Sequence, residues 1–398
     1  MSERGESGLS VGARFSLVYA ALFLQVGVAL PFFPVVIAGQ GLSPSRLALV
    51  LAAIAGARTI VTPLLGFLSD RFRLWRGFLV LIGLGAALGY AGFGMVHGFW
   101  GLLLLAFLLG PLYAAITPII DAHALRSAER RGGDFGRMRL WGSVAFLVTN
   151  IVGGALIGVL GASSITAILV SLTVLGALSV LLLPGGVHGA PGSAPRIGMT
   201  DVRKLLTMPR FLAVLLIGGG IQTTHVVLYN FGTLVWRDQG MGSTEIGLLW
   251  AIGVSAEVAL LSFGKLLVAR FGAERMLMLG GAAGALRWGV LALAPPLFPL
   301  LILQLLHAFT FALTYIAAIH LVQRAVPAQL AATAQTIYTV GTSGIFASAM
   351  TVLAGPLYAH FGAGVYAAPA MLAGLCALAA LFLFETALIP IEPVAEEP

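Results

Sequence analysis

Runs of apolar residues long enough to cross a membrane recur along the whole of this 398-residue chain. A bilayer core is about 30 Å thick, so a helix needs roughly 20 mostly apolar residues to span it. Hydrophobic residues make up 59% of the chain and charged residues only 9%, whereas a soluble domain is about 25% charged. The runs do not alternate apolar and polar residues as the strands of a membrane barrel do. The sequence therefore predicts an all-α membrane protein.

Twelve runs are predicted to be spanning helices. Glycine and proline within them are compatible with membrane helices, because neighbouring helices and side chains satisfy the freed backbone groups. The predicted spans are 15–38, 45–68, 76–96, 99–121, 137–160, 164–183, 209–235, 244–268, 274–294, 297–320, 332–357 and 363–384.

Positive charge gathers in alternate connections between the spans. The first of these connections holds Arg71, Arg73 and Arg76, whereas the opposite connections hold little beyond Arg46 and Arg237. By the positive-inside rule, the basic connections and both termini are expected on the cytoplasmic side. An abundance of Arg over Lys, with many Ala and Gly, indicates a GC-rich bacterial genome. The expected location is therefore the bacterial cell (inner) membrane, with multiple spans. The net charge of +7 lies in short loops, so nucleic acid is not expected as a partner.

An internal repeat relates the two halves of the chain. GLSPSRLALVLAAIAGAR (41–58) aligns without gaps with GMGSTEIGLLWAIGVSAE (240–257), at an offset of 240 − 41 = 199 residues. Two parallel, pseudo-symmetric sets of six helices are typical of transporters that bind their substrate between the halves, near the middle of the membrane.

This repeat divides the chain into two bundles and a connection. We predict an N-terminal six-helix bundle at 1–183, a cytoplasmic linker at 184–208, and a C-terminal six-helix bundle with a short acidic tail at 209–398. The linker begins with a Gly/Pro/Ser-rich stretch that is typical of flexible chain. Its segment TDVRKLL (200–206) is expected to form a short helix on the membrane surface.

The repeat sets Arg58 opposite Glu257. At 1.5 Å per residue, Arg58 lies about 18 Å from Asp70 at the cytoplasmic edge, near the middle of the membrane. An ionisable residue there costs roughly 2.5–3.5 kcal/mol and normally faces a cavity or a partner. A guanidinium matches a carboxylate in bidentate fashion, so Arg58 is a candidate to bind an anionic substrate. The alternative is a structural ion pair, with Glu257 across the two halves.

Glu257 is the candidate for proton coupling. A carboxyl in a low-dielectric cavity favours its neutral form, and a nearby arginine favours the ionised form. Substrate arrival or helix movement could therefore switch its protonation. The alternative is a permanently ionised partner of Arg58 or Arg287.

Several motifs resemble those of a known family. The loop GFLSDRF (66–72) resembles the signature loop of the major facilitator superfamily, and DFGRMRLWGSVAF (134–146) resembles the start of span five in its lactose-permease-like branch. Further motifs resemble the phenylpropionate-transporter group of that branch: TPIIDA (117–122), RLWGSVAF (139–146), EVALLSF (257–263), RWG (287–289) and LQLLHAFTFALTYIAA (303–318). The resemblance covers nearly the whole chain. It implies the major facilitator fold and a monomeric proton symporter for a small organic solute.

The resemblance also implies roles for residues in spans eight to ten. The lactose-permease-like pattern supplies Glu, Arg and His to one coupling network, and Glu257, Arg287 and His307 match it. Relatives have a carboxylate three residues after this histidine, where this chain has Thr310. The proton step is therefore assigned to Glu257 or Asp121. His307 takes part in the coupling, or it is a satisfied core histidine.

A second pair is carried over from the N-terminal half. Asp121 and Arg139 match two residues that contact substrate in sugar-transporting relatives, at the same spacing of 139 − 121 = 18 residues. Arg139 is alternatively a cytoplasmic positive-inside charge. Asp70 and Arg71 belong to the signature loop, which braces the cytoplasmic gate in the family. The alternative for this loop is a solvated turn.

Four further residues are candidates for substrate binding. Gln25 and Asn230 lie in spans that border the cavity of this fold, and Trp141 and Phe311 offer aromatic walls for an apolar ring. Most aromatic residues in such a protein simply pack against lipid or other helices.

Together these features predict a transporter that carries protons with a small aromatic carboxylate-like solute. The alternatives are a sugar or nucleoside symporter, favoured if Asp121–Arg139 dominates, and a drug/proton antiporter. An enzyme is not expected, because no catalytic cluster is visible. No cofactor or metal is expected either, because the histidines lack metal-ligand spacing and Cys376 is the single cysteine.

Overall fold

The computed structural model describes residues 9–71, 75–131, 133–184 and 198–385, and all regular secondary structure in these ranges is helical. Ten helical segments within them are long and apolar enough to cross a membrane. The chain is therefore an all-α, multi-pass membrane protein, as the apolar runs predict.

The helices of the N-terminal half follow the predicted spans closely, with one exception. The predicted span 99–121 is divided by a turn at 109–111, where Pro111 lacks the N–H that an uninterrupted helix needs. The helices are α1 (Val11–Ala38), α2 (Pro44–Arg71), α3 (Trp75–Met95), α4 (Phe99–Leu108), α5 (Leu112–Arg131), α6 (Phe135–Leu160), α7 (Ser164–Ser179) and η1 (Val180–Leu182).

The C-terminal half is more often interrupted. The predicted helix at 200–206 is confirmed as α8, and the predicted span 244–268 is broken at Ser262 and Phe263, between α12 and α13. The elements are α8 (Met199–Leu206), α9 (Pro209–Thr223), α10 (His225–Val227), η2 (Leu228–Gly232), α11 (Thr233–Asp238), α12 (Ser243–Leu261), α13 (Gly264–Phe271), α14 (Ala273–Leu291), α15 (Leu297–Leu305), η3 (Ala308–Leu313), α16 (Thr314–Ala325), η4 (Ala328–Leu330), α17 (Ala331–Val340), η5 (Gly341–Phe346), α18 (Ala347–Phe361), η6 (Gly362–Tyr366), α19 (Ala367–Ala380) and η7 (Leu381–Glu385).

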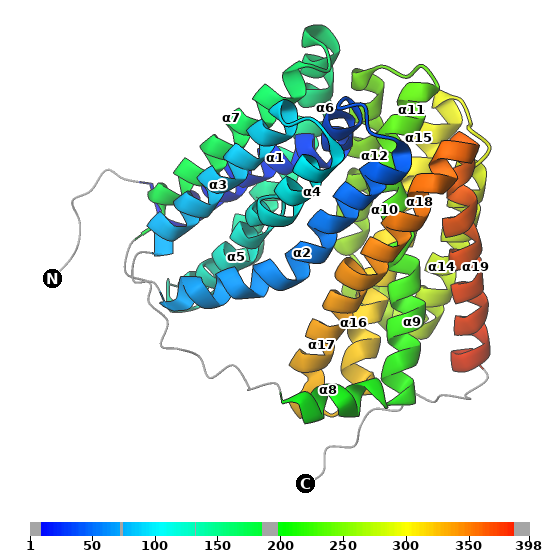
Figure 1. Cartoon of the computed structure of the whole chain (residues 1–398). Helices are drawn as coiled ribbons and strands as arrows, with labels where there is room; N and C mark the ends of the chain where they lie inside the picture. The colour runs from blue at the N-terminus through cyan, green and yellow to red at the C-terminus, as the bar shows by residue number, and fades with distance from the viewer. Residues whose placement is uncertain (1–8, 72–74, 132, 185–197, 386–398) are drawn as a thin grey trace, which may run out of the picture.

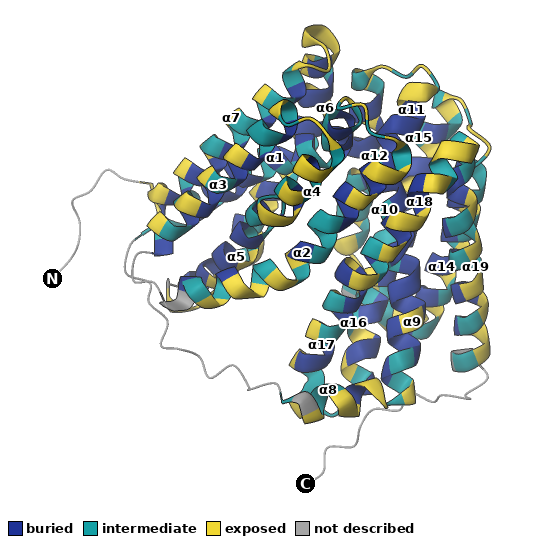
Figure 2. Ribbon diagram, in the orientation of Figure 1, coloured by how far each residue is buried: buried dark blue, intermediate teal, exposed yellow. Residues whose placement is uncertain are grey.

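The two halves lie side by side and meet chiefly along two helix crossings, with further contacts between α1 and α11. In Figure 1, α1–α7 occupy one side and α9–α19 the other, and the two sets converge toward the end where α11 lies and diverge toward the end where α8 lies. Across the boundary, α2 packs on α18 and α6 packs on α12. Figure 2 shows that exposed residues cover the outer faces of these helices. Large apolar side chains there, such as Leu88 and Val159, are 70% and 85% exposed, as expected of a surface that contacts lipid.

Both crossings are close contacts at glycines. A Cβ on Gly355 of α18 would meet the carbonyl oxygen of Pro44 at 2.9 Å, and a Cβ on Gly154 of α6 would meet the carbonyl oxygen of Ser243 at 2.6 Å. Small residues let membrane helices approach in this way. Pro44 and Ser243 are 243 − 44 = 199 residues apart, which equals the offset of the repeat. Pro44 and Ser243 are therefore equivalent residues of the two repeats, and each lies against a glycine of the other half.

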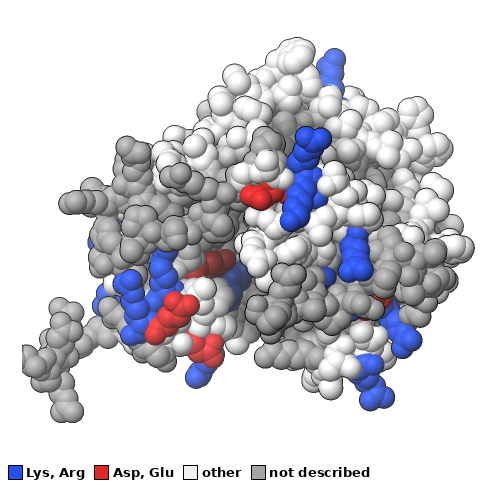
Figure 3. All heavy atoms as spheres, turned by 90° about the horizontal axis from the view of Figure 1, so that it is seen from below, with Lys and Arg blue, Asp and Glu red and all other residues white. Residues whose placement is uncertain are grey.

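Basic side chains gather at the end where α8 lies. Figure 3, which views the molecule from that end, shows Lys and Arg side chains around the face, together with acidic residues. Among the described residues, these include Arg126 and Arg130 near the end of α5, Arg203 and Lys204 in α8, and Arg270 in α13. Arg46 and Arg237 lie at the opposite end, at the start of α2 and the end of α11.

Candidate functional site

Arg287 of α14 is a fully buried cation held by neutral partners. Its Nη2 donates to Oε1 of Gln304 at 2.7 Å, and its Nη1 donates to Nδ1 of His307 and to Oγ1 of Thr310, both at 3.1 Å. Its Cζ also lies 4.6 Å from the ring centroid of Trp288, within the range of a cation–π contact. Arg287 is therefore fixed inside the C-terminal half, at 0% exposure.

The hydrogen bond from Arg287 determines the tautomer of His307. A guanidinium has only donors, so Nδ1 of His307 must accept, and the ring hydrogen lies on Nε2. That nitrogen lies 3.2 Å from Oε2 of Glu257 and donates to it. The result is a chain of hydrogen bonds from Arg287 through a neutral His307 to Glu257. The His307 side chain is 6% exposed and that of Glu257 is 19% exposed, so Glu257 is the more accessible of these two.

Thr310 forms a second branch from Arg287. Nδ1 of His225 lies 3.2 Å from the carbonyl oxygen of Gln222, which can only accept, so this nitrogen carries the hydrogen. The Nε2 of His225 then accepts the hydroxyl hydrogen of Thr310 at 3.0 Å. Thr310, where the lactose-permease-like pattern has a carboxylate, thus links Arg287 to a neutral histidine. This leaves Glu257 as the carboxyl of this network.

The wall around His307 is aromatic, and its helix is locally widened. The π-helical turn η3 begins directly after His307, and π-helical turns are frequent at functional sites. Phe311, in that turn, stacks on His307 with ring centroids 5.3 Å apart and meets His225 edge-on at 5.5 Å. The predicted residue Phe311 therefore lies in this network.

The predicted pair in the N-terminal half is also brought together. Nε of Arg139 lies 3.7 Å from Oδ1 of Asp121, and the hydroxyl of Tyr19 donates to the same oxygen at 2.6 Å. The Arg139 guanidinium carbon lies 4.1 Å from the ring centroid of Phe23. The side chains of Arg139 and Asp121 are 31% and 36% exposed, so this cluster combines charge, an aromatic face and access.

Arg58 has a different environment from Arg287. Its side chain is exposed, and within the described ranges it makes no hydrogen bond or ion pair. Ile60 and Phe67 mark the apolar, exposed face of α2. Arg58 precedes Ile60 by two residues, about 200° around the helix, so it points away from that face and toward the interior of the molecule.

The possible ion pair between Arg58 and Glu257 is not formed in this structure, in which Glu257 bonds to His307. The repeat aligns the two charges along the sequence, but the two-fold relation between halves does not require equivalent residues to touch. Arg58 is thus an uncompensated cation among the described residues.

Trp141 does not lie with the predicted site. It is 55% exposed and shares one face of α6 with Val144 and Val148, which are 40% and 49% exposed. Trp141 follows Arg139 by two residues and so points about 200° away from it. The interpretation of Trp141 as an aromatic wall of the cavity is therefore wrong: its side chain lies on the apolar outer face.

The remaining candidates are Gln25, Asn230, Asp70 and Arg71. Gln25 of α1 is 1% exposed. Nδ2 of Asn230, in η2, donates to Oγ1 of Thr351 in α18 at 2.9 Å, so it ties two helices together. The side chains of Asp70 and Arg71, at the end of α2, lie outside the described residues.

Two residues of the network, His225 and Gln304, are not among the site residues predicted from the sequence. His225 stood out only as a polar residue in span seven, and Gln304 had no signal beyond its polarity inside an apolar run. Their contacts with Arg287 and Thr310 depend on how α10, α14 and α15 pack. A buried polar residue on each of several spans is the signal that could have found them.

Comparison with known proteins identifies the class of protein. Residues 13–367 match the MFS_1 like family, so the chain belongs to this family of major facilitator transporters, and it is a transporter and not an enzyme. It is 30% identical over 375 residues to the probable 3-phenylpropionic acid transporter of Escherichia coli strain K12, covering 92% of this chain and 96% of that protein. It is 28% identical to the maltose permease of Geobacillus stearothermophilus, covering 88% of each chain.

Solved structures show the same fold. The crystal structure of the nucleoside transporter NupG superimposes with a TM-score of 0.81 over 94% of this chain and 100% of that one, at 17% identity. The fold and the relatives together establish a multi-pass membrane transporter that binds small molecules.

Proposed function

We propose that the protein is a proton-coupled symporter that carries a small aromatic carboxylate by alternating access. The observation that carries this proposal is the hydrogen-bonded chain from Arg287 through His307 to Glu257, with Glu257 at its accessible end. His307 can take a proton on Nδ1 only by giving up its bond to Arg287. Glu257 can take one without breaking either bond, so we assign it the coupling proton.

Twelve spans in two six-helix bundles are the architecture we propose. The segment Ala328–Leu383 has 56 residues, more than twice the roughly 20 that one span needs, and η6 divides it into two helices. The helix α14 adds a further span of 19 residues. With the other nine candidates these give 9 + 2 + 1 = 12 spans. The bundle boundaries remain those predicted, 1–183 and 209–398, and the equivalent glycine contacts of Pro44 and Ser243 support their pseudo-symmetry.

The orientation follows from charge. Basic side chains at the α8 end point to the cytoplasm by the positive-inside rule, with an even number of spans leaving both termini there. The proposed location is the bacterial inner membrane, and the proposed active unit is a monomer, as the family resemblance implies.

Two arginines, Arg58 and Arg139, support a carboxylate as the substrate. Arg58 is exposed toward the interior without a described partner. Arg139 combines its ion pair with Asp121 and its contact with the ring of Phe23, and its side chain is still 31% exposed. A bidentate guanidinium and an aromatic face suit an acid that carries a ring. The printed name of the Escherichia coli relative, a probable 3-phenylpropionic acid transporter, agrees with this class.

A nucleoside or sugar symporter is the second candidate. Asp121, Arg139 and Tyr19 form a polar cluster that offers both donors and acceptors, which suits hydroxyl groups. The relatives named maltose permease and nucleoside transporter agree with this alternative.

Ligand-induced thermal stabilisation separates the two candidates. A ligand at 100 times its Kd stabilises the native state by about 2.7 kcal/mol, so small aromatic carboxylates should raise the Tm of the purified protein, and sugars and nucleosides should not. Arg58→Lys keeps the charge but loses the bidentate geometry, and we expect it to weaken carboxylate binding about tenfold, or about 1.4 kcal/mol.

The matched control is Arg46→Lys, because Arg46 lies at the opposite end, 5.6 Å from the ring centroid of Phe99. It should bind as the wild type does. Unchanged affinity in Arg58→Lys would show that Arg58 does not hold the carboxylate, and stabilisation by sugars or nucleosides alone would favour the second candidate.

A further inference from the structure

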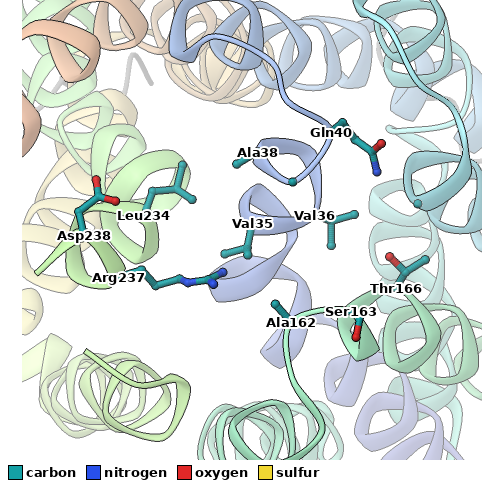
Figure 4. Close-up of a pocket in the computed structure, with 12 residues that line it drawn as sticks. Val35, Val36, Ala38, Gln40, Ala162, Ser163, Thr166, Leu234, Arg237 and Asp238 are labelled. Atoms are coloured by element: carbon teal, nitrogen blue, oxygen red, sulfur yellow. The ribbon is translucent and has the colours of Figure 1, made fainter. Parts of the chain in front are cut away.

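A pocket lies between the two halves at the end opposite the basic face. Its volume is about 640 Å³, within the range of roughly 300–1,000 Å³ typical of small-molecule sites. Figure 4 shows residues from α1, from the α6–α7 connection and from α11 around it. The lining includes Val35, Ala38, Gln40, Ser163, Leu234 and Arg237. Arg58, Arg139 and Glu257 do not line it, so it is distinct from the proposed central site.

The pocket faces equivalent ends of two helices. Residues 35–38 of α1 and 234–237 of α11 are 199 positions apart, the offset of the repeat. In that register Arg237 corresponds to Ala38. The two sides of the pocket are therefore related by the repeat, but only the C-terminal side carries the cation.

The guanidinium of Arg237 is available to a ligand. Its side chain is exposed and extends from α11 toward Val35 of α1 (Figure 4). Asp238 also lines the pocket. Its carboxylate accepts a hydrogen bond from the hydroxyl of Tyr358 at 2.6 Å and points in another direction from the Arg237 guanidinium in Figure 4. Within the described residues, Arg237 makes no hydrogen bond or ion pair.

Arg237 lies at the end of the molecule that is expected to face away from the cytoplasm. Arginine is disfavoured on the non-cytoplasmic side of a membrane protein by the positive-inside rule. Arg46 at the same end is accounted for by its contact with the ring of Phe99. Arg237 has no such contact and faces the pocket instead.

We propose that this pocket is an outer loading site, in which Arg237 binds the carboxylate of the transported anion before it reaches the central site. Val35 and Leu234 contact the apolar part of the anion, and the Gln40 amide and the Ser163 hydroxyl are polar groups of the same pocket. The carboxylate class rests on the proposed function, and the site itself rests on the pocket and its unpaired cation.

Uptake measured separately from the two faces of the membrane tests this site. In right-side-out vesicles, Arg237→Gln should raise the KM for an aromatic carboxylate such as 3-phenylpropionate about tenfold, the loss expected for one charge-assisted hydrogen bond. In inside-out vesicles its KM should equal that of the wild type. The outer KM of the variant should also depend less on ionic strength, because screening acts on the steering by Arg237.

Two further variants keep the test decisive. Ala38→Glu sets a carboxylate across the pocket from an intact Arg237, and it should raise the outer KM in the same way. Arg46→Gln removes the other cation at this end and should leave both KM values unchanged. An outer KM that is unchanged in both Arg237→Gln and Ala38→Glu would overturn the loading site, as would an equal rise from both faces. Failure of the wild-type protein to take up any aromatic carboxylate would instead refute the substrate class.

Discussion

Glu257→Gln is expected to abolish accumulation of substrate against its gradient while preserving exchange of substrate across the membrane. Glutamine has nearly the same shape as glutamate. Its Oε1 can still accept the hydrogen from Nε2 of His307, which lies 3.2 Å from Oε2 of Glu257 in the wild-type structure. It cannot bind or release a proton at neutral pH. The bundles should therefore still carry bound substrate, but an imposed pH gradient should no longer drive net uptake. Accumulation and counterflow in proteoliposomes measure the two properties separately.

The matched control is Glu274→Gln. Glu274 also accepts from a basic side chain, with Arg324 Nη1 2.8 Å from its Oε1, but it lies at the start of α14 near the basic face. Its variant should accumulate substrate as the wild type does. Full accumulation by Glu257→Gln would remove Glu257 from the coupling role and leave Asp121 as the candidate carboxyl.

Gly247→Leu is expected to shift the protein away from the conformation described here. A Cβ on Gly247 would collide with the carbonyl oxygen of Asn150, and it would lie 3.3 Å from Cα of Gly154, at the crossing of α6 and α12. This crossing closes the end where α11 lies. Overpacking costs about 1–3 kcal/mol, which corresponds to roughly a 5- to 150-fold change in the ratio of closed to open outer ends. Both uptake and counterflow should fall, because both need this end to close.

Spin-label distances across the outer end measure the shift. Labels at His97 and Leu293, in a Cys376→Ala background, report on the two halves from exposed positions. The distance distribution should move to longer values in Gly247→Leu. The control is Gly289→Leu, because a Cβ on Gly289 meets nothing within 4 Å. Wild-type distances and wild-type transport in Gly247→Leu would show that this crossing does not hold the outer end closed.

Most of the fold could be predicted from local patterns. A run of apolar residues specifies a spanning helix wherever it occurs, because the backbone in lipid has to satisfy its own hydrogen bonds. The short helix α8 was also predicted, from TDVRKLL. The turn between α4 and α5 and the π-helical turns η2, η3 and η5 were not predicted. Such interruptions depend on packing against other helices, which hydrophobic runs do not encode.

The candidate site was predicted in its chemistry but only partly in its geometry. Arg287 and His307 stood out because an ionisable residue in a membrane span is costly, and the structure places them in contact. The rotation of a helix about its axis is set by its neighbours. For that reason Trp141 was assigned to the wrong face, and the bond between Thr310 and His225 was not foreseen.

Uptake by the purified wild-type protein in proteoliposomes, with and without an imposed pH gradient, tests the central claim most directly. We expect 3-phenylpropionate or a similar aromatic carboxylate to accumulate above its external concentration only when the lumen is alkaline. Dissipation of the gradient with a protonophore should release the accumulated substrate. Uptake that does not respond to the gradient, or proton-driven uptake of sugars or nucleosides with no uptake of aromatic carboxylates, would contradict the account.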